Sequence, residues 1–124
     1  MTTGSLHVIS DLDALQALRF SRPRDMMSVQ RFSQRFHYEA ARLEELCHVR
    51  PGLVHDNPFS ARVQQFMRHA LDVVARRMLA VPDLDEAIEW FRSERIAELG
   101  GRTPEEIVAD GEQRLLLKAP SAPN

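Results

Sequence analysis

Apolar residues recur at spacings of three and four along most of the chain, and this periodicity restricts the fold more than any other feature. The clearest stripe comprises Val63, Phe66, Met67, Ala70, Val74 and Met78. Such spacing places apolar side chains on one face of an α-helix. No alternating run of β-branched residues indicates a strand. We therefore predict an all-α fold, a compact helical domain with a helix-turn-helix-like N-terminal part and a C-terminal helical part.

Proline, glycine and helix-capping residues divide this pattern into separate helices. Asp83 with Glu86 and Thr103 with Glu106 are spaced as capping boxes, and Pro104 suits the first helical position. The first expected elements are a helix after Ser10 that Pro23 interrupts, helices over 29–36 and 39–47, and a loop over 51–57. They are followed by a helix from Asn57 or Ser60 to Pro82 and by a helix over 84–91 that Gly100-Gly101 stop. A short helix before Gly111 and a last turn over 112–117 come last. We group them as an N-terminal helical region, 1–57, and a long helix plus C-terminal region, 58–124, in one compact unit.

Length and composition are those of one globular domain. The 124 residues are 44% hydrophobic and 27% charged, which is close to the average for globular proteins. No apolar run approaches the roughly 20 residues that span a bilayer, and the N-terminus lacks a signal-peptide pattern. The single cysteine, Cys47, allows no internal disulfide. We expect a cytoplasmic protein without a membrane partner.

The net charge of −2 conceals an uneven distribution. Between Arg19 and Arg77 there are eleven arginines and six acids, whereas between Asp83 and Glu112 there are ten acids and three arginines. The segregation is either chance along amphipathic helices or a division between a basic and an acidic part. Near-neutrality therefore does not exclude binding to nucleic-acid phosphates.

The usual constellations of catalytic residues are absent from the sequence. No Gly-rich phosphate loop is present, and the five histidines (His7, His37, His48, His55 and His69) lack the spacing of metal ligands on a helix. Cys47, His48 and His55 form only a weak candidate for a metal site, and ordinary surface histidines are favoured. Cys47 lies on an apolar stripe with Leu43, which favours a small buried hydrophobe over a nucleophile. We predict no enzyme, no cofactor and no metal.

Residues 32–43 have the apolar rhythm of a helix-turn-helix. The first helix ends near Phe36, His37-Tyr38 form the turn, and the second helix begins at Glu39. The second helix of a DNA reader enters the major groove, but this one carries Glu39, Glu44 and Glu45 against Arg42 alone. Carboxylates are unfavourable there, so a structural helix pair is favoured over sequence-specific binding. Arg31 and Arg35 on the preceding helix could still contact DNA phosphates.

The most specific string of the chain lies in its C-terminal half. It reads Ala87-Ile88-Glu89-Trp90-Phe91, then Leu99-Gly100-Gly101-Arg102-Thr103-Pro104-Glu105-Glu106-Ile107-Val108, and later Gly111. This string resembles the toxin-binding domain of the Xre/MbcA/ParS antitoxins, whose pattern is Trp and an apolar residue, a spacer, Leu-Gly-Gly-x-x-Pro, an apolar pair and a later Gly. The resemblance covers roughly residues 28–117, with the specific part about 25 residues long. Arg92-Ser93-Glu94-Arg95 replace the Pro and Asn that many members carry.

The resemblance implies a non-enzymatic antitoxin of a bacterial type II toxin–antitoxin module. Family members pair with RES-domain toxins, which consume NAD or transfer its ADP-ribose, and they block the toxin active site. They frequently also repress their own operon, so operator DNA is an implied partner, and the implied assembly is a homodimer or a hetero-oligomer with the toxin. The implied toxin-binding residues are Arg102, Glu105, Glu106, Arg114, Leu115, Leu116, Leu117 and Lys118; the implied structural residues are Trp90, Phe91, Leu99, Gly100, Gly101, Thr103, Pro104 and Gly111.

Elementary conformational arguments agree with a corner at this string. Gly100 and Gly101 permit positive φ after a helix end, and Thr103-Pro104 restart a helix at once. We expect Trp90, Leu99 and Ile107 in the core, and Arg102, Glu105 and Glu106 on the exposed side. Leu115-Leu116-Leu117-Lys118 either enters the toxin cleft or closes the core of the chain itself.

Two other classes of function compete with this interpretation. The first is a helical DNA-binding transcriptional regulator without a toxin, which would place Arg19, Arg22, Arg24, Arg31 and Arg35 on phosphates. Salt-dependent binding to its own promoter DNA would distinguish it. The second is a helical scaffold with an unrelated partner.

Overall fold

The computed structural model describes residues 26–117, and within them the chain is all-α, as its periodicity predicts. The helix expected after Ser10 lies outside the described residues. In order, the elements are α2 (Val29–Phe36), α3 (Ala40–Cys47), α4 (Leu53–Asp56), α5 (Ala61–Arg77), α6 (Leu84–Ser93), the 3-10 helix η1 (Ala97–Leu99), α7 (Pro104–Ala109) and α8 (Arg114–Leu117). No strand occurs in this range.

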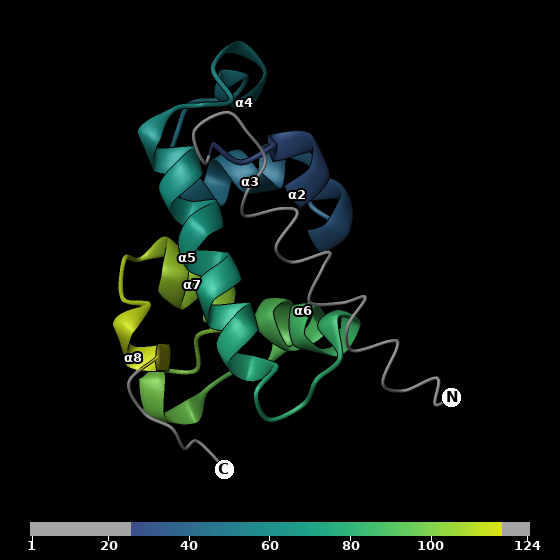
Figure 1. Cartoon of the computed structure of the whole chain (residues 1–124). Coiled ribbons are helices and arrows are strands. Elements are labelled where there is room, and N and C mark those ends of the chain that lie inside the picture. Colours follow the sequence, from purple (N-terminus) through teal and green to yellow (C-terminus); the bar gives the residue numbers. More distant parts are fainter. Residues whose placement is uncertain (1–25, 118–124) are drawn as a thin grey trace, which may run out of the picture.

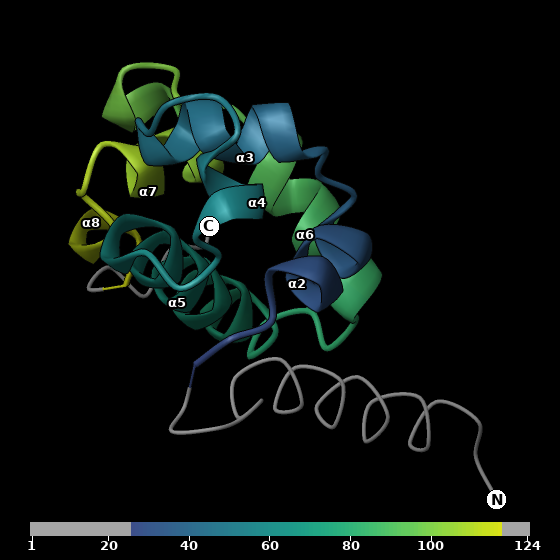
Figure 2. The same cartoon turned by 90° about the horizontal axis from the view of Figure 1, so that it is seen from above.

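The long helix α5 is the centre of the arrangement. It packs against α3, α6, α7 and α8, and in both Figure 1 and Figure 2 α7 and α8 lie together beside it. Its buried face carries the apolar stripe that the sequence indicates, including Val63, Met67 and Val74. None of the described helices has both the length and the apolar character that crossing a membrane requires.

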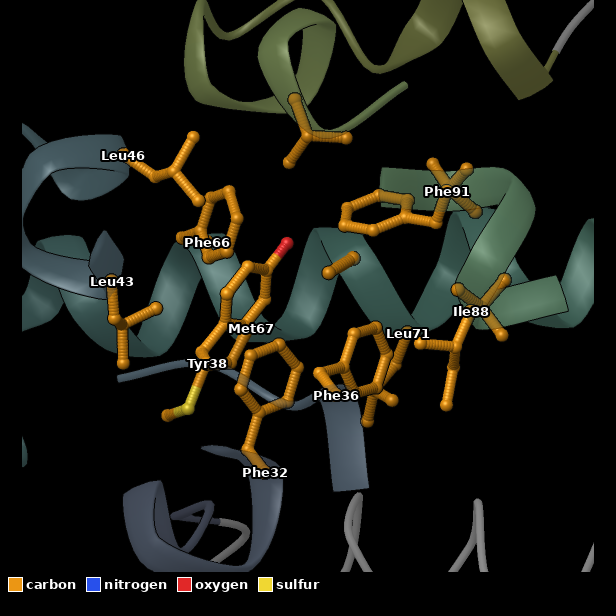
Figure 3. Close-up of a cluster of buried hydrophobic side chains, with 14 of the residues drawn as sticks. Phe32, Phe36, Tyr38, Leu43, Leu46, Phe66, Met67, Leu71, Ile88 and Phe91 are labelled. Carbon is orange, nitrogen blue, oxygen red and sulfur yellow. The ribbon is translucent and has the colours of Figure 1, made fainter. Parts of the chain in front are cut away.

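Aromatic rings from three helices fill the core in front of α5 (Figure 3). Phe32 and Phe36, one turn apart on α2, stack with their centroids 4.3 Å apart. Phe91 of α6 meets Phe36 edge-on at 5.8 Å, and Phe66 of α5 meets Phe32 edge-on at 6.4 Å. Stacked and edge-on pairs are the favourable geometries of aromatic rings. These contacts attach α2 to both α5 and α6.

Helix α5 ends earlier than the sequence predicts. Ser60 caps the start by accepting a hydrogen bond from Val63 N, as predicted, but the helix ends at Arg77 instead of continuing to Pro82. The following turn is tightened by hydrogen bonds from Leu79 N to the Arg76 carbonyl and from Ala80 N to the Arg77 carbonyl. A residue before proline also avoids the helical conformation. The pattern of apolar residues therefore continues beyond the helix.

The expected loop over 51–57 contains the one-turn helix α4. Glu44, on α3, is 6% exposed, and its Oε2 accepts hydrogen bonds from Gly52 N at 3.0 Å and Val54 N at 3.1 Å. A carboxylate at the start of a helix satisfies amide groups that would otherwise lack partners. The cap comes from eight or ten residues away, so no local signal announces this turn.

The glycines Gly100 and Gly101 do not end α6, contrary to expectation. That helix ends earlier, at Ser93, and η1 lies between it and the glycines. At its start, Asp83 accepts from Glu86 N as predicted. The capping box is nevertheless incomplete, because the Glu86 carboxylate accepts hydrogen bonds from Arg77 instead.

The burial of α5 yields a matched test of the core. Leu71 is fully buried on α5, whereas Leu79, just beyond the helix, is 78% exposed. We expect Leu71→Ala to lower the free energy of unfolding by about 2–5 kcal/mol, because it removes buried methyl groups and leaves a cavity. Leu79→Ala should change it by less than about 0.5 kcal/mol. Urea unfolding measures both, and equal losses would contradict the described packing.

Candidate functional site

The Leu-Gly-Gly-x-x-Pro string forms a tight corner between η1 and α7. Gly100 and Gly101 have φ angles of 80° and 72°, in the left-handed region that glycine adopts without a Cβ clash. Backbone hydrogen bonds from Ile96 N to the Arg102 carbonyl, at 3.0 Å, and from Gly101 N to the Ile96 carbonyl, at 2.9 Å, close the turn. The predicted positive φ at both glycines is confirmed.

The corner leads directly into α7 through a complete capping box. Glu106 N donates to Thr103 Oγ1 at 3.3 Å, and Thr103 N donates to Glu106 Oε1 at 3.0 Å. Pro104 occupies the first turn, as predicted. Because the Glu106 carboxylate completes the cap, it is committed to the fold before any partner is bound.

Arg102 joins the corner to the segment that precedes α8. Its Nη1 donates to Asp110 Oδ2 at 2.9 Å, its Nη2 to Glu112 Oε1 at 3.1 Å, and its Nε to the Leu99 carbonyl at 3.0 Å. The hydrogen bonds to Asp110 and then to Glu112 raise the pKa of Arg102 above its ordinary value. Gly111, with a φ of 78°, lies between the two acids. The arginine thus holds the chain on both sides of this glycine.

The expectation that Glu105 is exposed is wrong. This side chain is 4% exposed, since the first turn of α7 faces inward. Tyr38 Oη donates to its Oε1, Arg42 Nη2 donates to its Oε2 at 2.6 Å, and Arg92 Nε lies 3.8 Å from Oε1. A buried carboxylate is tolerated when charges and hydrogen bonds of this kind surround it. We call Glu105, Tyr38, Arg42 and Arg92 the Glu105 network.

Arg92 extends the Glu105 network to the turn between α2 and α3. Its Nη1 donates to the carbonyls of Phe36, at 3.3 Å, and His37, at 2.9 Å, at the end of α2. Its guanidinium also stacks over the Tyr38 ring, 4.6 Å from the centroid. The helix-turn-helix-like pair, α6 and the corner are therefore held to one another by polar contacts.

The remaining motif residues divide between the core and its edge. Phe91 and Ile107 are fully buried. Trp90 is half-buried, packs against the core and stacks under the Arg77 guanidinium, 5.0 Å from the ring centroid. Leu99 is also only half-buried, so the core assignment is confirmed for Ile107 and only partly correct for Trp90 and Leu99.

The hypothesis that the leucines of α8 insert into the toxin requires them to be exposed. None of the three is fully exposed. Leu116 and Leu117 are partly buried and pack against the core, and Leu115 is also partly buried. This supports the alternative that the leucines close the core of the chain itself. Arg114 is exposed beside them. Lys118 lies outside the described residues.

The predicted order of two helices joined by a short turn is present in α2 and α3. His37 ends α2 with a left-handed φ of 62°, and Glu39 is the N-cap of α3. The expectation that Glu44 faces the DNA groove is wrong, because its carboxylate points inward and caps α4. Glu45, by contrast, is exposed and pairs with Arg42 at 2.9 Å.

The arginines proposed for phosphate contacts differ in their surroundings. Arg31 is exposed on α2. Arg35 lies 3.2 Å from Asp85 of α6 and is about one-third exposed, so a phosphate would compete with that carboxylate. Arg19, Arg22 and Arg24 lie outside the described residues.

Cys47 is buried, as predicted, and burial raises the pKa of its thiol to about 12. This pKa opposes the thiolate form that a nucleophile or metal ligand needs. His48 Nε2 lies 3.2 Å from the Ala109 carbonyl, whereas His55 is exposed beside Asp56. Within residues 26–117 no group of three histidine, cysteine or acidic residues could hold a metal ion.

Sequence reasoning missed Tyr38, Arg42 and Arg92 as partners of Glu105. They are separated from it by 67, 63 and 13 residues, so only the fold brings them together. Comparison of the chain with protein-family models, curated proteins and solved structures found no match.

The Glu105 network makes a specific prediction for stability. Glu105→Ala leaves Tyr38, Arg42 and Arg92 without their common carboxylate. We expect a loss of about 2–4 kcal/mol in the free energy of unfolding, somewhat less than for a fully buried pair because both arginines are about one-third exposed. Glu45→Ala removes an exposed partner of Arg42 and should cost less than about 0.5 kcal/mol. A Glu105→Ala protein as stable as Glu45→Ala would contradict the network.

Proposed function

We propose that this chain is the antitoxin of a type II toxin–antitoxin module, a non-enzymatic cytoplasmic protein that binds a RES-domain toxin and blocks its NAD-binding cleft. The observation that carries the proposal is the conformation of the corner at Leu99–Pro104. The string on which the family resemblance rests forms a turn with two left-handed glycines, followed by a complete capping box. The sequence pattern thus corresponds to a defined structural element.

The arrangement of the C-terminal part supports a rigid inhibitor surface. Arg102 fixes the segment around Gly111, and Leu116 and Leu117 attach α8 to the core. A surface that is ordered before binding loses less conformational entropy on association. In this proposal inhibition is steric, and the NAD chemistry belongs to the toxin.

Burial narrows the residues that can touch the toxin. Glu105 is enclosed, so we assign it to the fold and remove it from the proposed contacts. The accessible candidates are Arg114, the outer side of Leu115 and the partly exposed surfaces of Arg102 and Glu106. Lys118 stays a proposed contact beyond the described residues.

Rescue of growth tests the proposal. A RES-domain toxin encoded next to this chain would be co-expressed with it, and we expect the wild-type chain to restore growth. The double variant Arg114→Glu, Leu115→Asp should lose rescue and bind the toxin at least about tenfold more weakly, because it places negative charge in the proposed contact. Point variants are preferable to deletion of 112–124, which would also remove Glu112 and the leucines that pack on the core.

The matched control carries the same changes elsewhere. Arg31→Glu, Leu79→Asp alters an exposed arginine and an exposed leucine outside α7 and α8 and should keep rescue. Rescue by the Arg114→Glu, Leu115→Asp variant would refute the assigned contact. No rescue by the wild-type chain would refute the antitoxin function. If the chain then bound its own promoter DNA with strong salt dependence, the alternative of a DNA-binding regulator would be supported.

A further inference from the structure

A cleft of about 270 Å³ opens between α5 and the ends of α3 and α7. Its floor is apolar, with Leu46, Phe66 and Val108 among the lining residues. Gly111 and Gln113 contribute to its rim. They belong to the segment that Arg102 holds, immediately before Arg114 in the sequence.

The polar lining of the cleft is basic or neutral. Arg62, His48, His69, Gln65 and Gln113 line it, and no aspartate or glutamate does. Arg62, Gln65 and His69 are spaced i, i+3 and i+7 on α5, which places them on one face of the helix. The side chains of Arg62 and His69 make no hydrogen bond or ion pair with other groups of residues 26–117. An arginine and an imidazole so placed can both donate to an anion.

The size of the cleft restricts what can occupy it. Sites for cofactors and drug-sized ligands usually enclose about 300–1,000 Å³, so a cleft of about 270 Å³ lies below that range. A dinucleotide is too large for it. A protein side chain fits, and that of an aspartate or glutamate carries the carboxylate that Arg62 can bind.

We propose that this cleft is an anchor pocket for an acidic side chain of a partner protein. Arg62 and His69 bind the carboxylate, and Phe66 and Val108 contact the apolar stem. The identity of the partner rests on the proposed antitoxin function, because the rim of the cleft leads into α8. The chemistry of the pocket does not rest on it.

Charge reversal with a matched control tests the pocket in the complex. Arg62→Glu places a carboxylate in the cleft, whereas Arg68→Glu makes the same change at an exposed position of α5 outside the lining. In calorimetric titrations with the toxin encoded next to this chain, we expect Arg62→Glu to weaken binding at least about tenfold. Arg68→Glu should change it by less than about threefold. If the toxin binds the wild-type chain and Arg62→Glu alike, the pocket is refuted and the antitoxin function stands.

A second measurement tests the pocket without the toxin. N-acetyl-L-aspartate N-methylamide carries one carboxylate and two amide N–H groups, and it can be titrated at millimolar concentration into the isotope-labelled chain. We expect chemical-shift changes at the side chains of Arg62 and His69, retained in Arg68→Glu and lost in Arg62→Glu. Absence of these shifts in the wild-type chain would refute the pocket. Their presence without toxin binding would support the pocket and count against the antitoxin function alone.

Discussion

The burial of one carboxylate, that of Glu105, determines how the parts of this domain are placed. A charged group inside a protein is stable only if its partners are held in good geometry. Here those partners come from the turn after α2, from α3 and from α6, while Glu105 itself lies in the first turn of α7. Moving any of these elements would take a hydrogen-bond or charge partner away from Glu105. The Leu-Gly-Gly corner and the helix-turn-helix-like pair therefore act as one body.

The segregation of charge along the sequence has an internal explanation in this structure. Arginines of the basic stretch pair with acids of the acidic stretch: Arg35 with Asp85, Arg42 with Glu105, and Arg77 with Glu86. These pairs join α2, α3 and α5 to α6 and α7. Because these arginines and acids pair within the domain, fewer charged groups are left for partners than composition suggests. Arg62 and Arg114 are basic groups outside these pairs, and they lie in or beside the two contacts that we propose.

Several signals between neighbouring residues predicted the structure correctly, although the Asp83–Glu86 capping box is incomplete. The periodicity of α5, the Ser60 cap and the Thr103–Glu106 capping box depend on neighbouring residues, so they could be predicted. The inward positions of Glu44 and Glu105 could not, because glutamate on a helix is usually solvent-exposed. Glu44 caps a helix eight residues away, and Glu105 meets Tyr38 from 67 residues away. For the candidate site, the corner was predictable, whereas the polar network and the cleft depend on tertiary packing.

Ionisation of Tyr38, the only tyrosine in the chain, tests most directly whether the Tyr38 side chain of the Glu105 network is enclosed. Burial first, and then the charge of Glu105, raises the pKa of Tyr38 above its ordinary value near 10. Since the folded chain holds this proton more tightly than the unfolded chain, its stabilising effect is complete below pH about 10 and is lost as the pH rises further. Ultraviolet absorbance should show no tyrosinate at pH about 11 while circular dichroism stays native. An ordinary titration near pH 10 in the folded protein would contradict the account.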